Sequence, residues 1–273
     1  KESLGGVCLN WGCIPTKALL KSAQVFNYLK HADDYGLTVK EYDKNFDAVV
    51  NRSRNVAEGM SKGVQFLMKK NKIDILTGSG KIKADKKVDV TDDKGNTLEY
   101  SADSIILATG ARSRELPNLP QDGEKIIGYR KAMTLKKQPK SMVVVGSGAI
   151  GVEFAYFYNS IGTEVTVVEF LPNIVPNEDI DVSKALEKNF KKQGIKIMTK
   201  SAVESVDTSG ELCKVTVKTE KGEEILEAEI VLSAVGIQAN IEDLEEINQV
   251  DDTNAQISII KEADKNNKIY EQR

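Results

Sequence analysis

The fold is decided by the stretch Met142-Val143-Val144-Val145-Gly146-Ser147-Gly148-Ala149-Ile150-Gly151-Val152-Glu153-Phe154. An apolar run precedes three glycines spaced Gly-x-Gly-x-x-Gly, and apolar residues at helical spacing follow as far as Ile161. A second strand pattern over residues 164–169 completes a strand–helix–strand order. The glycine spacing alone is weak evidence, but in this context it predicts a dinucleotide-binding βαβ unit.

The three glycines in this stretch have two physical tasks. Gly146 and Gly148 permit a tight turn and a close approach to a pyrophosphate, which binds at the N-terminus of the helix. Ala149 and Ile150 open that helix, so we assign them to the cofactor site as well. Gly151 lets the helix pack against the preceding strand.

The second strand ends at an acidic residue, Glu169, which lies 23 residues after Gly146. That spacing is near the one expected for a carboxylate that accepts hydrogen bonds from an adenine ribose. The same carboxylate would repel a 2′-phosphate, and residues 170–172 offer no arginine to receive one. The sequence therefore favours NAD over NADP.

A second informative stretch lies near the start of the chain, Leu4-Gly5-Gly6-Val7-Cys8-Leu9-Asn10-Trp11-Gly12-Cys13-Ile14-Pro15-Thr16-Lys17. Five residues of regular helix rise ~7.5 Å, which exceeds the roughly 7 Å limit on the Cα separation of a disulfide. A bridge between Cys8 and Cys13 therefore needs an irregular turn, which Gly12 permits. Pro15 is suited to the first position of the helix that follows. A thiol at this entrance faces the positive end of the helix dipole, which favours the thiolate.

The cysteine pair has two other interpretations. A buried structural disulfide is possible, although the chain is not rich in cysteine. Half of a metal site would need further ligands, and Cys213 and His31 lack motif partners. Cys213 lies in a period-two strand pattern and is expected in the core, whereas His31 is expected at a solvent-exposed helix end. Redox chemistry is the favoured interpretation.

The composition excludes several classes of function. The chain has 273 residues, enough for one large or two ordinary domains. Its 40% apolar and 29% charged residues are typical of a globular protein, and a net charge of −3 gives no support for nucleic acid or an anionic membrane as partner. No apolar run approaches the ~20 residues of a membrane span, and no signal-peptide pattern opens the chain. One close cysteine pair among three cysteines favours a cytoplasmic setting.

The remaining elements follow from periodicity and turn residues. Helices are expected at residues 17–31, 46–71 and 181–194. Strands are expected at residues 37–39, 73–76, 86–90, 97–100, 104–111, 195–198, 202–203, 213–217, 224–227 and 229–234. Residues 92–96 form the turn of a hairpin, and residues 104–111 read as a fully buried strand.

The first motif resembles a known active site. Gly5-Gly6-x-Cys8-x-Asn10-x-Gly12-Cys13-x-Pro15-x-Lys17 resembles that of the FAD-dependent pyridine nucleotide–disulfide oxidoreductases, and its wording is most similar to the dihydrolipoamide dehydrogenases among them. The resemblance implies that Cys8 is the thiol that exchanges with substrate and that Cys13 lies next to the flavin. It also implies that Lys17 lies near the flavin N5 and pairs with Glu153. Thiols and nicotinamide do not normally exchange hydride directly, and FAD would carry the electrons between them.

The resemblance also implies a domain plan. It is an α/β fold with two FAD/NAD(P)-binding Rossmann-like domains, of which the flavin domain is incomplete at both ends. Residues 1–115 would be the partial flavin domain with the redox disulfide helix, residues 116–238 the NAD-binding domain, and residues 239–273 a divergent or truncated return to the flavin domain. Further cofactor contacts would come from Gly80, Thr109, Gly110, Val203 and Gly236. We expect missing sequence upstream of Lys1, where the family's first flavin-binding glycine motif would lie.

The expected activity is that of an NAD-dependent dehydrogenase. It would oxidise dihydrolipoamide on the lipoyl domain of a 2-oxo acid dehydrogenase or glycine cleavage complex, and the full-length enzyme would be a homodimer. Because the family's first flavin-binding glycine motif would precede Lys1, the isolated chain is expected to bind FAD poorly. Because the family's catalytic histidine motif is not found, the chain is also expected to turn over slowly or not at all. One alternative is another flavin disulfide reductase, similar to glutathione or mercuric reductase. The other is a non-catalytic, NAD-binding or redox-sensing fragment.

Overall fold

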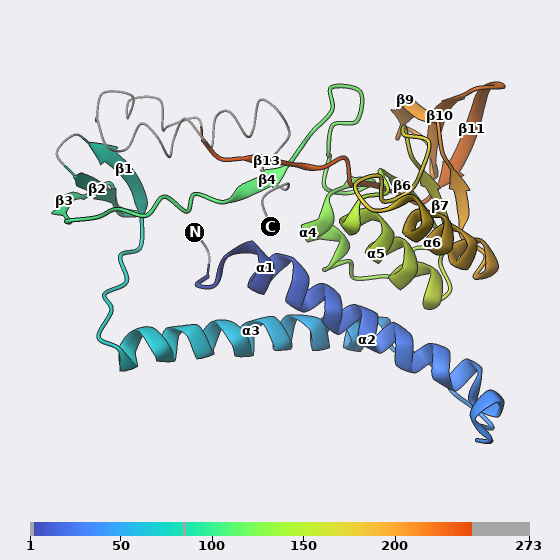
Figure 1. Ribbon diagram of the computed structural model, residues 1–273, viewed down its shortest axis with the longest axis horizontal. Helices are drawn as coiled ribbons and strands as arrows, with labels where there is room; N and C mark the ends of the chain where they lie inside the picture. Colours follow the sequence, from blue (N-terminus) through green and yellow to red (C-terminus); the bar gives the residue numbers. More distant parts are fainter. Residues whose placement is uncertain (1–2, 84–85, 242–273) are drawn as a thin grey trace. The chain divides into compact units, whose positions relative to one another are not determined.

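The computed structural model describes residues 3–83 and 86–241, which form two compact units (Figure 1). Among the described residues, the first unit holds residues 3–4, 63–112 and 238–241. The second unit holds Gly5–Lys62 and Ser113–Ile237. The division at residues 115 and 238 into a flavin and an NAD domain stays a prediction, and most of the expected C-terminal segment lies outside the described residues.

A five-stranded parallel sheet forms the centre of the second unit. Its strands, in spatial order, are β5 (Ile126–Ile127), β12 (Ile230–Ser233), β6 (Ser141–Val145), β7 (Glu164–Val168) and β8 (Lys196–Met198). Each neighbouring pair is parallel. The strand–helix–strand order predicted around the three glycines is confirmed, and with it the α/β class of the fold.

Helices cover one face of this sheet. Helix α5 (Ala149–Ser160) links β6 to β7, α6 (Ile180–Lys192) precedes β8, and the N-terminal helix α2 (Cys13–Lys30) packs against α5. The core on this side joins Leu19 of α2 to Phe154 and Tyr158 of α5 and to the side chains of Met142 and Val144 from β6. Tyr158 donates from its hydroxyl to the Ala132 carbonyl in α4 (Tyr129–Ala132) at 2.5 Å, so its one polar group is satisfied in the core.

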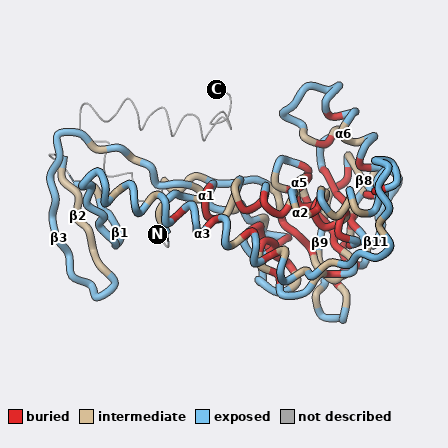
Figure 2. The backbone as a smooth tube through the Cα atoms, turned by 90° about the horizontal axis from the view of Figure 1, so that it is seen from below, coloured by how far each residue is buried: buried red, intermediate tan, exposed pale blue. Residues whose placement is uncertain are grey.

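An antiparallel sheet covers the opposite face. It consists of β9 (Ala202–Asp207), β10 (Cys213–Thr219) and β11 (Gly222–Ala228) in the order β11-β10-β9. Cys213, Val215 and Val217 of β10 pack with Val143 and Val145 of β6, the alternate residues from those that face the helices. Burial on both faces explains why β6 is a continuous apolar run, and buried residues concentrate in this unit (Figure 2). Cys213 is fully buried, so its predicted place in the core is confirmed.

The first unit contains an antiparallel sheet of three strands. These are β1 (Ser79–Lys83), β2 (Lys87–Thr91) and β3 (Thr97–Ser101), in that order. In the turn between β2 and β3, the Asp92 carboxylate accepts from the backbone N–H of Lys94 at 2.9 Å and of Asn96 at 2.8 Å. The predicted hairpin is thus confirmed. The predicted helix at residues 46–71 is also confirmed, as α3 (Phe46–Lys70).

Three predicted strands are wrong. Residues 37–39, 73–76 and 104–110 have no strand structure, and Ile106 is 91% exposed. A fully buried strand needs neighbours on both edges and cover on both faces. Among the described residues, 104–110 pair with no strand, and Leu107 is only partly buried, as are Ile82 and Ile241 of the same hydrophobic cluster. Pairing begins after this run, where β4 (Ala111–Ser113) meets β13 (Ile237–Ala239).

None of the helices in the described part of the chain combines the length and apolarity needed to cross a bilayer. A 3₁₀ turn, η1 (Ala32–Tyr35), follows α2, and His31 lies exposed at the end of that helix, as predicted.

Candidate functional site

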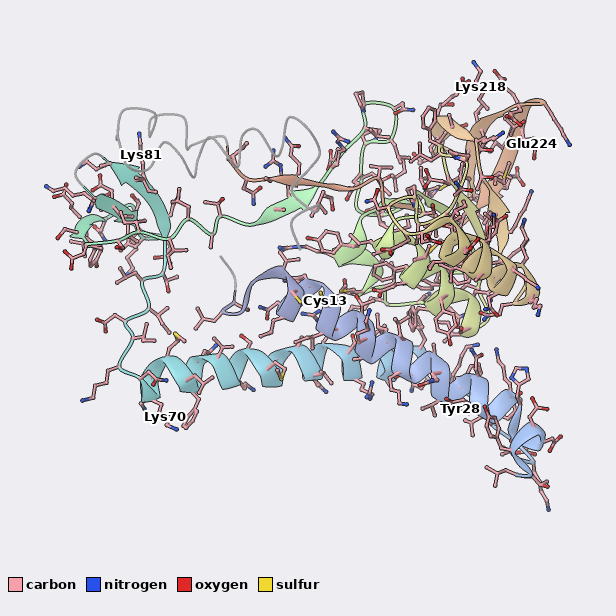
Figure 3. The ribbon with its side chains drawn as sticks, in the orientation of Figure 1. Cys13, Tyr28, Lys70, Lys81, Lys218 and Glu224 are labelled. Carbon is pink, nitrogen blue, oxygen red and sulfur yellow. The ribbon has the colours of Figure 1, made fainter. Side chains whose placement is uncertain are left out.

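The two N-terminal cysteines lie on either side of a break between two helices. Cys8 is in the short helix α1 (Gly6–Trp11). Cys13, labelled in Figure 3, is the first residue of α2. Gly12 separates the helices with φ −138° and ψ −121°. A Cβ on Gly12 would lie 3.1 Å from the Cys8 Cα and from the Val7 carbonyl oxygen, so the turn is packed closely against α1. The irregular turn predicted at Gly12 is confirmed.

The second helix starts earlier than Pro15 indicated. Pro15 is the third residue of α2 rather than the first. Its missing N–H still costs nothing there, because the first four N–H groups of a helix have no partner within the helix. Thr16 holds the helix start instead, since its backbone N–H and its Oγ1 both donate to the Gly12 carbonyl, at 3.1 and 2.8 Å.

The two thiols are free, exposed and close to one another. The hydrogen bond between the Cys8 and Cys13 thiols raises the pKa of Cys13, and partial burial raises it further, while the nearby Lys17 lowers it. The backbone N–H at the helix entrance does lower the pKa of Cys13, as predicted, but the net direction in this reduced form is upward. A thiol neighbour in direct contact outweighs the helix dipole, whose effect is small at an exposed site. The contact does keep both sulfurs ready for bond formation.

An ion pair joins the cysteine-bearing helix to the helix of the glycine motif. Lys17 Nζ on α2 contacts Glu153 Oε1 on α5. The Lys17 side chain is 62% exposed and that of Glu153 is 28% exposed, so the pair adds little to stability. The predicted pairing is confirmed, whereas the expected position of Lys17 near a flavin stays a prediction.

Two of the motif glycines are sterically required. Gly146 has φ +97°, a conformation that favours glycine, and a Cβ there would lie 2.5 Å from the Ala234 carbonyl oxygen. A Cβ on Gly151 would overlap the Gly146 carbonyl oxygen. These contacts bring the first turn of α5 against the end of β6, which is the packing predicted from the glycine spacing.

Gly148 has a different environment from the other two. It is exposed at the start of α5, and a Cβ there would meet nothing within 4 Å. Ala149 beside it is exposed and Ile150 half-buried. No side chain caps this helix end. The room beside Gly148, together with the uncapped N–H groups of a 12-residue helix, suits an anionic group such as a pyrophosphate.

Glu169 is held at the end of β7 by three donors. It is 7% exposed. Its Oε2 accepts from the Ser147 N–H at 2.8 Å and the Ser147 Oγ at 2.6 Å, and its Oε1 accepts from the Leu171 N–H at 2.8 Å. A carboxylate offers about four acceptor sites, so this arrangement leaves room for a further donor. The ribose contact stays a prediction, and the carboxylate has a second task in supporting the glycine turn.

Ser147 was missed by the sequence reasoning. It occupies a variable position of the glycine motif, and the structure buries it fully. A buried hydroxyl needs a hydrogen-bond partner, so a serine inside the motif was the one signal in the sequence for this contact. Val203, predicted at the cofactor site, lies in β9 and accepts a hydrogen bond from Asn118 Nδ2 at 2.7 Å. Gly236 is exposed with φ +107°. The cofactor contacts of Val203 and Gly236 stay predictions.

Three predicted residues belong to the first unit. Gly80 lies in β1, opposite Val90. Thr109 and Gly110 are exposed, and their carbonyl groups accept hydrogen bonds from Asn240, from its Nδ2 at 3.1 Å and its N–H at 3.0 Å. Gly110 has φ +76°. Their flavin contacts stay predictions as well.

Comparisons with known proteins agree over most of the chain. The family model described as pyridine nucleotide-disulphide oxidoreductase matches residues 2–267. The dihydrolipoyl dehydrogenase of Zymomonas mobilis is 42% identical over 242 residues, which are 88% of this chain and 52% of that protein. The dihydrolipoyl dehydrogenase of Rhizobium etli is 43% identical over 260 residues, which are 89% of this chain and 54% of that protein.

A solved structure agrees in fold. The crystal structure of LpdA from Mycobacterium tuberculosis superposes with a TM-score of 0.82 and 27% sequence identity, covering 91% of this chain and 54% of that one. The chain thus spans about half the length of the proteins it matches. With a family match over nearly all of its residues, the chain belongs to the pyridine nucleotide-disulphide oxidoreductase family.

Proposed function

We propose that this chain carries the thiol and NAD-binding parts of a dihydrolipoyl dehydrogenase, which oxidises protein-bound dihydrolipoamide to lipoamide and reduces NAD⁺. One observation carries the proposal. Cys8 and Cys13 lie in contact at a helix junction, and Lys17 ties that junction through Glu153 to the helix of the glycine turn. The relatives named dihydrolipoyl dehydrogenase, at 42% and 43% identity, support the same assignment.

The thiol step transfers two electrons and two protons. With the pair oxidised, one substrate thiolate attacks the Cys8 sulfur and Cys13 leaves as a thiolate. The second substrate thiolate then attacks the substrate sulfur in the mixed disulfide, which closes the lipoamide ring and releases Cys8. Dihydrolipoamide is oxidised and the cysteine pair is reduced. The exposed position of Cys8 suits it to the first attack.

The nucleotide part rests on the glycine turn. The open helix N-terminus at Gly148 fits a pyrophosphate, and the buried carboxylate of Glu169 favours an unphosphorylated ribose. NAD is therefore the proposed nicotinamide cofactor.

FAD is the second proposed cofactor, and when bound it supplies two-electron transfer between a dithiol and nicotinamide. The residues of this chain that fit FAD are those expected beside its flavin ring. Cys13 and Lys17 are exposed, and Lys17 brings a positive charge held in place by Glu153. The sequence holds a single Gly-x-Gly-x-x-Gly turn, at residues 146–151, and we assign that turn to NAD.

The proposed partner is the lipoyl domain of a 2-oxo acid dehydrogenase or glycine cleavage complex. A homodimer is proposed for the full-length enzyme. A cytoplasmic setting is part of the proposal, because a cycling cysteine pair needs a compartment in which thiols are kept reduced.

The thiol step can be tested without flavin. The oxidised chain is incubated with dihydrolipoamide, quenched with a maleimide and analysed by intact mass. We expect two newly labelled cysteines per chain and one lipoamide formed. The variant Cys213→Ala, which removes only the core thiol, should behave in the same way, whereas Cys8→Ser should form no lipoamide.

Two results would contradict the proposal. Reduction by glutathione at a higher rate than by dihydrolipoamide would favour a glutathione-reductase-like enzyme. A chain that binds NADH, followed by the nucleotide's fluorescence, but exchanges with neither thiol would favour a non-catalytic fragment.

A further inference from the structure

Two arginine side chains lie over the aromatic ring of Trp11. The guanidinium carbon of Arg54 is 4.1 Å from the ring centroid, and that of Arg130 is 5.1 Å away. Trp11 ends α1, Arg54 comes from α3 and Arg130 from α4, all within the second unit. Both distances fall within the range of cation–π attraction. We call these three residues the tryptophan clamp.

Arg54 makes a second contact in the same place. Its Nη1 donates to the Asn10 carbonyl oxygen at 2.7 Å. Asn10 is one of the last residues of α1, whose final carbonyls have no partner within the helix. The guanidinium therefore caps the C-terminal end of α1 with a positive charge, which the helix dipole favours. Partial burial lowers the pKa of Arg54, but an arginine remains protonated in proteins.

The clamp acts on the segment that connects the cysteines. Between Cys8 and Cys13 the chain contains the end of α1 and then Gly12, which has no side chain to fix its conformation. Thr16 holds the α2 side of the turn through the Gly12 carbonyl. On the α1 side, the contacts of Arg54 with Asn10 and Trp11 have the same task.

We propose that Arg54 and Arg130 are positioning residues that set the thiol–disulfide equilibrium of the Cys8–Cys13 pair by fixing the turn between α1 and α2. This inference rests on the proposed redox function of the pair. Neither arginine takes part in the exchange. They restrict the range of separations that the two sulfurs sample, and so raise the effective concentration of one thiol at the other.

The equilibrium is measured against glutathione. The reduced pair loses two electrons and two protons as it forms its disulfide, and one oxidised glutathione gains them and leaves as two glutathione thiols. Releasing the end of α1 should lower the equilibrium constant for disulfide formation by ~3- to 10-fold, because the closure depends on preorganisation. A tenfold change corresponds to about 30 mV for this two-electron couple.

The variants are Arg54→Gln, Arg54→Lys and Arg130→Gln, titrated in glutathione buffers and read by maleimide labelling. Trp11 is the one tryptophan of the chain, so its fluorescence gives a second reading from within the clamp. We expect Arg54→Gln to have the largest effect. Arg54→Lys should recover part of the loss, because an ammonium keeps the charge but not the planar fork.

The matched control is Arg52→Gln, also on α3. Arg52 donates from Nη1 to the Ala18 carbonyl at 2.8 Å and to Ser22 Oγ at 3.3 Å, so it braces α2 beyond the turn. The equilibrium constant for disulfide formation in Arg52→Gln should stay within about twofold of that in the parent chain, since this substitution leaves the clamp intact.

Two results would overturn the inference. One is an equal equilibrium constant for disulfide formation in Arg54→Gln and the parent, and the other is a decrease in Arg52→Gln as large as that in Arg54→Gln. NADH binding reports whether each variant is folded, and if Arg54→Gln does not fold, Arg54→Lys and Arg130→Gln decide the question in the same titration. Failure of the proposed function has a different signature. The parent chain would then fail to exchange with dihydrolipoamide, while its equilibrium with glutathione could still be measured.

Discussion

Replacing Glu169 with alanine should lower the free energy of unfolding of the second unit by about 2–4 kcal/mol. The carboxylate accepts from the N–H and the hydroxyl of Ser147, which is fully buried, and from the N–H of Leu171, which is 41% exposed. A buried donor left without a partner costs about 1–3 kcal/mol, whereas water can reach the N–H of Leu171 at lower cost. Glu169→Gln keeps the volume and one acceptor oxygen, so it should lose only about 1 kcal/mol.

Urea unfolding followed by the fluorescence of Trp11 measures this loss, because that single tryptophan lies in the second unit. The control is Glu220→Ala, which removes a surface ion pair with Lys200 at 3.0 Å and should stay within about 0.5 kcal/mol of the parent. A Glu169→Ala chain as stable as this control would refute the three hydrogen bonds as a support of the glycine turn. NADH titration of Glu169→Gln separates the two tasks of the residue. Unchanged affinity would mean that the carboxylate serves the turn and not the ribose.

Three further changes have defined outcomes. Glu169→Arg should shift the preference from NADH towards NADPH, because it exchanges a repulsive charge for an attractive one, and an unchanged ratio of the two dissociation constants would contradict the ribose assignment. Cys8→Ser should lower the pKa of Cys13, since the Cys8 thiol is the main cause of its elevation; the pH dependence of Cys13 alkylation by iodoacetamide measures it. In the parent, the stabilising contribution of that raised pKa is fully present below the unfolded pKa and is lost as the pH rises through the folded one. Gly151→Val should abolish NADH binding and destabilise the second unit, since even a Cβ overlaps the Gly146 carbonyl oxygen, whereas Gly148→Ala should remain folded; equal unfolding midpoints would refute this contrast.

The parallel sheet could be predicted because its signals are local. The apolar run at β6, the three glycines and the helical spacing of α5 are adjacent in sequence, and each supports the same arrangement. Residues 104–111 carry an equally strong apolar run, yet they form no buried strand. Burial of a strand depends on neighbours that the run itself does not encode. The same pattern therefore succeeded where partners were present among the described residues and failed where they were not.

In the candidate site, too, the features with local sequence signals could be predicted and those that depend on distant residues could not. Gly12 indicated the break between Cys8 and Cys13, because a glycine just ahead of a helix start is a local signal for an irregular turn. The pKa of Cys13 could not be predicted, since it depends on a hydrogen bond across that break. The clamp was missed for a related reason. Arg54 and Arg130 come from distant helices, and an arginine on a helix face is usually just solvated.

Helix α5 connects the two halves of the candidate site. Its open N-terminus at Gly148 lies at the glycine turn, and Glu153, about one turn further along, contacts Lys17 on α2. Lys17 is itself about one turn from Cys13. The path from the glycine turn to the thiol pair thus runs through two helix starts and one ion pair, without a flexible loop. Because an exposed ion pair contributes little to folding, its presence at this junction is better explained by alignment of the two helices than by stability.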